Sequence, residues 1–380
     1  MKIIFAGGGT AGHINPALAI AGYVRERQPD AEILYIGAKG GMEERLVPQA
    51  GFDFKGITVQ GFRRKFSPKA LKDNLVTIKK AISAGKAAKR MILEFQPDLC
   101  IGTGGYVSGP VLRAAQKLGI PTLIHEQNAY PGVANKMLSK KADRVLLAMP
   151  DARKHFKGNC RFVDTGNPVR GEILAQERES ARKALGLDDR PVILSFGGSL
   201  GARKINESLA DIIARSAKDG KYQHIHAYGQ YGKWFPELLK EKGADLSAAK
   251  NLDIREYIND MPVCLAAADV VIARAGAITL SEIQVKGKPA ILIPSPNVAE
   301  NHQYHNAMSL VSKNAAVMIE EKDLTPEKLT EEIDKLASDP ARLAEYSENA
   351  RKMAISDASK RIYTVMIEIL SADKSRRKKQ

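Results

Sequence analysis

The chain has few cysteines for its length. Only Cys100, Cys160 and Cys264 occur among 380 residues, and their wide spacing forms no Cys-x-x-Cys motif. An odd number of scattered thiols excludes a disulfide framework and a cysteine-based zinc site, and is typical of a reducing cytoplasm.

Long apolar runs are also missing. No stretch approaches the roughly 20 apolar residues that a helix needs to cross a bilayer. The apolar run at the N-terminus ends in glycine just after Phe5 and Ala6. We therefore expect neither a signal peptide nor a membrane-spanning helix.

Acidic residues are scarce relative to basic ones. The chain has 58 Lys and Arg against 43 Asp and Glu, a formal net charge of +15. Such a charge indicates an anionic partner, which could be nucleic acid, a membrane surface or a phosphorylated substrate. Aromatic residues make up only 6% of the chain, and no zinc-finger spacing or recognition-helix pattern is present. We therefore expect no nucleic-acid partner.

Strand-like apolar segments alternate with helical patterns along most of the chain. The segments are EILYIG, DLCIGTGG, IPTLIHE and DRVLLA, and after a break RPVILSFGG, HIHAYG, ADVVIARAG and KPAILIP. This alternation predicts an α/β fold with parallel sheets covered by helices on both faces. A chain of this length is expected to form two domains, and the break falls in the sequence DTGNPVRGEIL.

A glycine motif occurs twice, at residues 8–12 and 197–201, in the form GG[ST]xG at an offset of 189. Each copy follows a predicted strand and precedes a predicted helix, which suggests two Rossmann-like domains. A third glycine cluster, GTGGYVSGP, follows another strand of the first half. In open α/β sheets, ligands bind at the carboxyl ends of the strands, where all three clusters are expected.

The first cluster leads into His13. Residues 3–6 are predicted as a strand, and Asn15-Pro16 as a helix start, so His13 is expected where backbone N–H groups and the helix dipole converge. Gly7, Gly9 and Gly12 spell a dinucleotide fingerprint, but the second strand ends at Gly37 and Lys39 without the acidic residue that holds a ribose. A dinucleotide-dependent oxidoreductase is therefore poorly supported.

Seven motifs in order resemble one family. They are GGGTAGHINPALAIA, GTGGYVSGPV, HEQNAYPGVANK, GNPVR, FGGSLGAR, ARAGAITLSE and ENHQYHNA. Together they resemble the MurG family, the bacterial N-acetylglucosaminyltransferases of peptidoglycan synthesis. Ala11 departs from the second glycine that many members carry, and its small size preserves the loop.

The resemblance implies a GT-B fold, with two Rossmann-like parallel-sheet domains facing a cleft. The expected parts are an acceptor- and membrane-binding domain at 1–164 and a UDP-GlcNAc-binding domain at 165–355. A C-terminal helix at 356–370, containing RIYTVMIEIL, would cross back to the first domain, followed by a basic tail at 371–380.

The implied activity is transfer of N-acetylglucosamine from UDP-GlcNAc to the 4-hydroxyl of the muramyl unit of lipid I (undecaprenyl-pyrophosphoryl-MurNAc-pentapeptide), forming lipid II with inversion. No cofactor or metal is expected, and the sequence has no Asp-x-Asp motif of the kind that holds a divalent metal in many sugar-nucleotide transferases. Helix N-termini and backbone N–H groups would then neutralise the departing diphosphate. The alternatives are another GT-B sugar-nucleotide transferase and the oxidoreductase.

His13 is the candidate general base, since a positive helix end disfavours the imidazolium, and Glu126 is the next candidate. The alternative for His13 is a hydrogen bond to a phosphate. The residues implied to bind substrate are Thr10, Ala11, Gly12, Asn128, Arg170, Ser199, Ile258, Ala277, Ile278, Thr279, Leu280, Ser281, Glu282 and Gln303.

The resemblance also divides these roles. Asn128 would bond the transferred sugar, Arg170 uracil or a phosphate, and Ser199 a phosphate oxygen. Ile258 would offer its backbone to uracil, Glu282 would hold the ribose hydroxyls, and Gln303 would select the hydroxyl pattern of GlcNAc. Simpler alternatives remain open: a salt bridge at the hinge for Arg170, and a helix cap for Ser199.

A basic amphipathic segment suggests how the chain reaches a lipid-linked acceptor. Leu71, Leu75, Ile78 and Ile82 share one helix face, and Lys72, Lys79, Lys80, Lys86, Lys89 and Arg90 surround it. We expect a peripheral protein on the cytoplasmic face of an anionic membrane, with cell-wall synthesis or division proteins as possible partners. In the alternative, the stripe packs on the core, with Ala81, Ala84 and Ala88 forming a separate buried face.

Overall fold

The computed structural model describes the backbone of residues 1–59 and 68–377, and the side chains of residues 1–59 and 82–373. The chain divides into two compact units, Met1–Pro168 with Asp357–Gln380, and Val169–Ser356. Each unit contains one parallel sheet, which confirms the predicted α/β fold with two Rossmann-like domains. Among the described residues, no helix is both long and apolar enough to span a bilayer.

The first unit contains a seven-stranded sheet in the order β3-β2-β1-β4-β5-β6-β7. Adjacent strands pair in parallel throughout. The central strand β4 is buried along its whole length, as expected of a sheet covered on both faces. The strands are β1 (Lys2–Gly7), β2 (Glu32–Ala38), β3 (Asp53–Ile57), β4 (Leu99–Gly104), β5 (Thr122–Glu126), β6 (Arg144–Leu147) and β7 (Phe162–Asp164).

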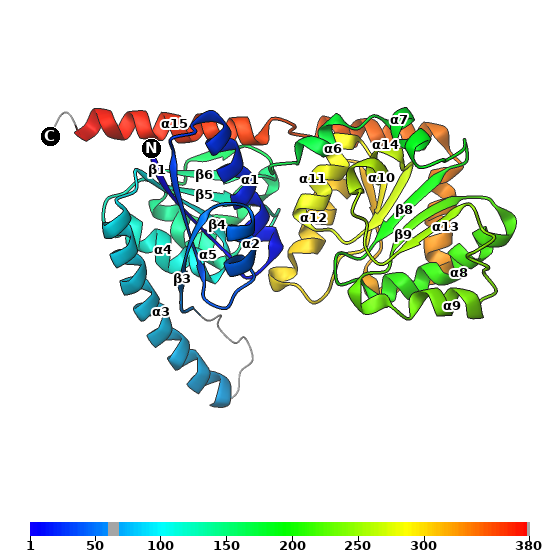
Figure 1. Cartoon of the computed structure of the whole chain (residues 1–380), viewed down its shortest axis with the longest axis horizontal. Helices are drawn as coiled ribbons and strands as arrows, with labels where there is room; N and C mark the ends of the chain where they lie inside the picture. The colour runs from blue at the N-terminus through cyan, green and yellow to red at the C-terminus, as the bar shows by residue number, and fades with distance from the viewer. Residues whose placement is uncertain (60–67, 378–380) are drawn as a thin grey trace. The chain divides into compact units, whose positions relative to one another are not determined.

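Two layers of helices cover this sheet (Figure 1). The cluster with Ile3, Phe5 and Ile20 includes Met366 of α15, so the C-terminal helix packs on the first unit as predicted. The helices are α1 (Ala11–Arg27), α2 (Glu43–Gln49), α3 (Pro68–Phe95), α4 (Gly105–Lys117), α5 (Val133–Leu138) and α15 (Ala358–Arg377), with 3-10 turns η1 (Ser139–Lys141) and η2 (Pro150–His155).

Helix α1 begins earlier than the sequence predicts. It starts at Ala11 after an extended Thr10, so the expected start at Asn15-Pro16 is wrong. Pro16 lies inside the helix, where it has no N–H to donate to the carbonyl oxygen of Gly12. The side chain of His13 therefore projects from the first turn of α1 instead of from a loop.

The second unit has a six-stranded parallel sheet in the order β10-β9-β8-β11-β12-β13. Its strands are β8 (Val192–Phe196), β9 (Gln223–Ala227), β10 (Leu252–Arg255), β11 (Val270–Ala273), β12 (Ala290–Leu292) and β13 (Ala316–Met318). The helices are α6 (Gly171–Ala175), α7 (Arg178–Ala184), α8 (Arg203–Asp219), α9 (Phe235–Glu241), α10 (Met261–Ala267), α11 (Ala277–Lys286), α12 (His302–Val311), α13 (Pro326–Ala337) and α14 (Pro340–Lys352), with 3-10 turns η3 (Gln230–Gly232), η4 (Ala299–Asn301) and η5 (Glu321–Asp323).

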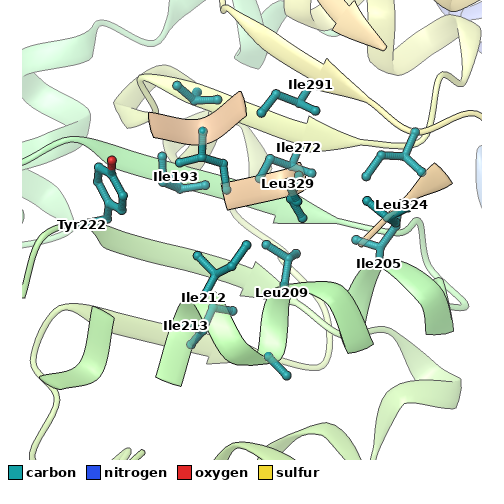
Figure 2. Packing of buried hydrophobic residues seen from close by; sticks show 14 of the residues in the cluster. Ile193, Ile205, Leu209, Ile212, Ile213, Tyr222, Ile272, Ile291, Leu324 and Leu329 are labelled. Atoms are coloured by element: carbon teal, nitrogen blue, oxygen red, sulfur yellow. The ribbon is translucent and has the colours of Figure 1, made fainter. Parts of the chain in front are cut away.

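Helix α8 supplies much of the core of this unit. Leu209 and Ile213 are fully buried and belong to the same cluster as Ile193 of β8 and Ile272 of β11. Figure 2 shows these side chains between helix and sheet. The tight packing fixes the loop between β8 and α8, which carries the second glycine motif.

Three histidines are buried in the sheets as neutral side chains. His125 Nε2 lies 3.0 Å from the Gly166 carbonyl oxygen, His224 Nε2 lies 3.0 Å from Ser216 Oγ, and His226 Nδ1 lies 2.9 Å from Ser195 Oγ. Burial lowers the pKa of His125 and His224 to about 4 and that of His226 to about 3. Because all three values lie below the ordinary histidine value, the unfolded chain binds more protons than the folded one.

We therefore expect the protein to lose stability on acidification. The free energy of unfolding should be unaffected by these histidines above about pH 6.5, and should fall between about pH 6.5 and 4 by about 1.4 kcal/mol per pH unit for each histidine. Urea unfolding at a series of pH values measures this slope. His224→Gln should reduce it by about one third, and an unchanged slope in that variant would contradict the assignment.

Candidate active site

The imidazole of His13 is held by the first glycine loop. Its Nδ1 lies 3.1 Å from the carbonyl oxygen of Gly8 and 3.3 Å from Thr10 Oγ1. A carbonyl oxygen can only accept a hydrogen bond, so Nδ1 carries the proton and donates it to Gly8. In the neutral ring, Nε2 is then the nitrogen with a free lone pair, which is the form that a general base requires.

The third glycine cluster closes around this ring. A Cβ atom on Gly104 would lie 3.0 Å from His13 Nε2, and one on Gly105 would lie 2.1 Å from the Gly8 carbonyl oxygen. Thr103 Oγ1 donates to the backbone oxygen of His13 at 2.7 Å. The loops after β1 and β4 thus form one site at the carboxyl edge of the first sheet, with Thr10, Ala11 and Gly12 exposed beside it.

A carboxylate that sequence reasoning missed lies behind the loop. Glu43 of α2 is fully buried, and it accepts the N–H of Ala38 at 2.8 Å and that of Gly9 at 3.3 Å. A Cβ on Gly8 would lie 2.0 Å from Glu43 Oε1, and one on Gly41 would lie 2.8 Å from Oε2. The pKa of Tyr35 lies far above its usual range, mainly because the side chain is buried and also because of the charge of Glu43.

Glu126 at the end of β5 is committed to hydrogen bonds. It is 1% exposed and accepts from the N and Nδ2 of Asn128 at 3.1 and 3.2 Å, from the N of Gly132 at 3.1 Å and from Asn135 Nδ2 at 2.8 Å. Four donors occupy both carboxylate oxygens, so Glu126 would have to give up one of these hydrogen bonds to act as the base, and that role stays a prediction. In this structure its contacts orient Asn128. Sequence reasoning missed Asn135, which lies in the first turn of α5.

The second glycine motif keeps only part of the geometry of the first. Gly9 and Gly198, at equivalent positions, have φ of +83° and +90°, which favours glycine at both. The motifs then diverge, because Gly12 lies in α1 whereas Gly201 has φ +85° in a longer loop. Helix α8 has Ala202 as its N-cap, so the alternative that Ser199 caps it is wrong. Ser199 is exposed at the carboxyl edge of the second sheet.

Residues 277–282 form the first turns of α11, directly after β11. Ala277, Leu280 and Ser281 are buried, and Ile278, Thr279 and Glu282 are partly buried. The N-terminus of this helix lies at the same sheet edge as Ser199, where its dipole favours an anion.

Arg170 and Glu282 form an ion pair in this structure. The nitrogen Nη2 of Arg170 lies 3.4 Å from Glu282 Oε1, with the side chains 54% and 13% exposed. Burial raises the pKa of Glu282, while the charge of Arg170 opposes the increase. The salt-bridge alternative for Arg170 is thus confirmed, and contact with uracil or phosphate stays a prediction.

The remaining predicted contacts also belong to the second unit. Gln303, on α12, accepts the backbone N–H of Ser295 through Oε1 at 2.9 Å. Ile258 follows β10, and the whole residue is 3% exposed, so the contact of its backbone with uracil stays a prediction. The structure therefore groups Arg170, Ser199, Ile258, residues 277–282 and Gln303 in one unit, and His13 with the first and third glycine clusters in the other.

Comparison with known proteins identifies the family. Residues 3–147 match the glycosyltransferase family 28 N-terminal domain, and residues 192–362 match its C-terminal domain. A relative from Acetivibrio thermocellus, named UDP-N-acetylglucosamine--N-acetylmuramyl-(pentapeptide) pyrophosphoryl-undecaprenol N-acetylglucosamine transferase, is 48% identical and covers 97% of this chain and 98% of its own length. The chain belongs to the MurG family.

Further comparisons agree with membership of the MurG family. A Bacillus cereus relative with the same name, numbered 1, is 42% identical over 97% of this chain and 100% of its own length. The crystal structure of MurG from Acinetobacter baumannii matches with a TM-score of 0.77 and 31% identity, over 97% of this chain and 99% of that one. The chain is a glycosyltransferase with the GT-B fold of the MurG family.

Proposed function

We propose that the chain transfers N-acetylglucosamine from UDP-GlcNAc to the 4-hydroxyl of the muramyl unit of lipid I, giving lipid II and UDP. The names of its relatives support the substrates, and the orientation of His13 carries the mechanism. With Nδ1 donating to Gly8, Nε2 is free to take the proton from the acceptor hydroxyl. The acceptor oxygen then attacks the anomeric carbon from the face opposite UDP, which inverts that centre.

The second unit supplies groups suited to the nucleotide. We assign the diphosphate to the N-terminus of α11 and the loop of Ser199, where backbone N–H groups and the helix dipole stabilise the charge that develops on UDP. Glu282 would accept hydrogen bonds from the ribose hydroxyls, and Arg170 would leave its ion pair for the nucleotide. Thr10, Ala11 and Gly12 are assigned to the donor's sugar and diphosphate, Asn128 to the transferred sugar, and Gln303 to the hydroxyl pattern of GlcNAc.

Nucleotide binding separates this function from the alternatives. A ligand that binds only the folded state raises the melting temperature by mass action. We expect UDP-GlcNAc and UDP to stabilise the protein in a thermal-shift assay, and NADH to have no effect. Stabilisation by NADH alone would contradict the proposal and favour an oxidoreductase. Glu282→Gln should weaken the shift caused by UDP, because its amide cannot accept hydrogen bonds with both terminal atoms.

We also propose that α3 brings the protein to an anionic membrane from the cytoplasmic side. Leu71, Leu75 and Ile78 lie outside the residues whose side chains are described, as do Lys72, Lys79 and Lys80. In the described part of α3, Ile82 and Leu93 are 59% and 56% exposed. Lys86, Lys89 and Arg90 are exposed as well, while Ala84 and Ala88 are buried in the core.

Sedimentation with vesicles tests this second proposal. Binding should require anionic lipid and weaken as salt rises, since each basic residue near the surface contributes about 1 kcal/mol. Replacing Ile82 and Leu93 together with serine should reduce binding with little change in melting temperature, because both side chains are exposed. Leu174→Ser, at a 37% exposed leucine of the second unit, is the matched control. Equal binding of the double variant and the control would contradict the assignment of this face.

A further inference from the structure

The peptide unit between Gly8 and Gly9 contacts both Glu43 and His13. The N–H of Gly9 donates to Glu43 Oε2 at 3.3 Å, and the carbonyl of Gly8, which belongs to the same peptide bond, lies 3.1 Å from His13 Nδ1. The carboxylate and the imidazole therefore bind opposite ends of one planar, polarisable group. We propose that Glu43 acts on His13 through the Gly8–Gly9 peptide unit and so positions the base; this inference rests on the proposed transferase function.

The physical basis is the cooperativity of hydrogen bonds in series. When a negative carboxylate accepts the N–H of a peptide unit, it pushes electron density toward the carbonyl oxygen of that unit. The oxygen then becomes a stronger hydrogen-bond acceptor. A stronger acceptor at Gly8 favours the tautomer with the proton on Nδ1. Nε2 is thereby kept free of a proton, as an acceptor for the substrate hydroxyl.

The surrounding residues hold the side chain of Glu43 in one position. Its side chain is fully buried, and it reaches across 34 residues of sequence to Gly9. Side chains at Gly8 or Gly37 would overlap it, because Cβ atoms there would lie 2.0 and 2.5 Å from its atoms. A second bond, from the N–H of Ala38 at 2.8 Å, fixes the other carboxylate oxygen. The carboxylate is therefore anchored at the end of β2 and aimed at the first glycine loop.

The neighbouring glutamate offers a matched control. Glu44 lies on the same helix and also accepts a backbone N–H, that of Gly40 at 2.7 Å, but this contact is exposed and does not involve the His13 loop. Glu43→Gln and Glu44→Gln remove the same charge from adjacent positions. Only the first should alter His13.

The direct readout is the tautomer of His13 in histidine labelled with ¹⁵N, which needs no substrate. In the wild type, we expect Nδ1 to be protonated and Nε2 unprotonated in the neutral ring. Glu43→Gln should increase the fraction protonated at Nε2 and lower kcat about tenfold, with KM for UDP-GlcNAc nearly unchanged. Glu44→Gln should change neither quantity. A Glu43→Gln variant that folds and keeps the wild-type tautomer would overturn the inference.

If Glu43→Gln fails to fold, the wild type still tests the coupling. The amide resonance of Gly9 should shift with pH together with the ring nitrogens of His13, and this shift should vanish in His13→Ala. A Gly9 resonance that does not follow the ring would overturn the inference. Failure of the proposed function is a separate result, because it would appear as unimpaired turnover in His13→Ala whatever the tautomer.

Discussion

His13→Ala is expected to lower kcat by about a hundredfold or more while leaving KM for UDP-GlcNAc nearly unchanged. The imidazole removes the proton of the acceptor hydroxyl only as the new bond forms, so its loss affects the transition state more than donor binding. The ring is held by the Gly8 carbonyl oxygen at 3.1 Å and is not part of the predicted nucleotide contacts. Steady-state kinetics with both substrates varied measures the two parameters.

The control for this variant is Asn15→Ala, an exposed position two residues further along α1. This variant tests whether truncating a neighbouring side chain of α1 is enough to impair turnover. Its kcat should match that of the wild type. Unchanged turnover in His13→Ala would show that His13 is not the base.

Glu126→Ala should be the most destabilising of the substitutions at the predicted site residues. The change leaves the buried amide of Asn135 without an acceptor, which costs about 1–3 kcal/mol, whereas the exposed N–H of Gly132 can bond to water. We expect the free energy of unfolding to fall by about 1–3 kcal/mol, measured by urea unfolding. KM for UDP-GlcNAc should rise, because Asn128 loses the acceptor that orients it.

Glu126→Gln distinguishes a positioning residue from a base. The amide retains one oxygen acceptor, so we expect residual turnover within about tenfold of the wild type and a smaller loss of stability. Abolished turnover with an unchanged unfolding midpoint would instead identify Glu126 as a reacting group. Glu94→Ala, at an exposed glutamate of α3, serves as the control and should leave the unfolding midpoint unchanged.

The central strands of both sheets could be predicted from sequence, but four edge strands could not. Strands β1, β4 and β8 are nearly continuous apolar runs because both faces of each sheet are covered. The edge strands β3, β7, β10 and β13 are short and only partly buried, so they lack this pattern. Burial on one side leaves too weak a periodic signal to separate a strand from a loop.

The site was predictable where function depends on local sequence. His13 follows its glycine loop directly, so the motif placed the residue beside the backbone groups that hold it. Glu43 could not be found in this way, because its contact with Gly9 joins two loops that only the pairing of β1 with β2 brings together. The start of α1 was misplaced because Pro16 usually marks a first turn, yet here the helix tolerates it five residues inside.

Product analysis tests the central claim most directly. The purified chain would be incubated with UDP-GlcNAc and undecaprenyl-pyrophosphoryl-MurNAc-pentapeptide in EDTA, with UDP release and acceptor mass followed together. We predict one N-acetylglucosamine added per UDP released, a β-linkage at the 4-hydroxyl by NMR, and no UDP release without acceptor. UDP-GlcNAc consumed without transfer to this acceptor, or transfer that appears only when a divalent metal is restored, would contradict the account.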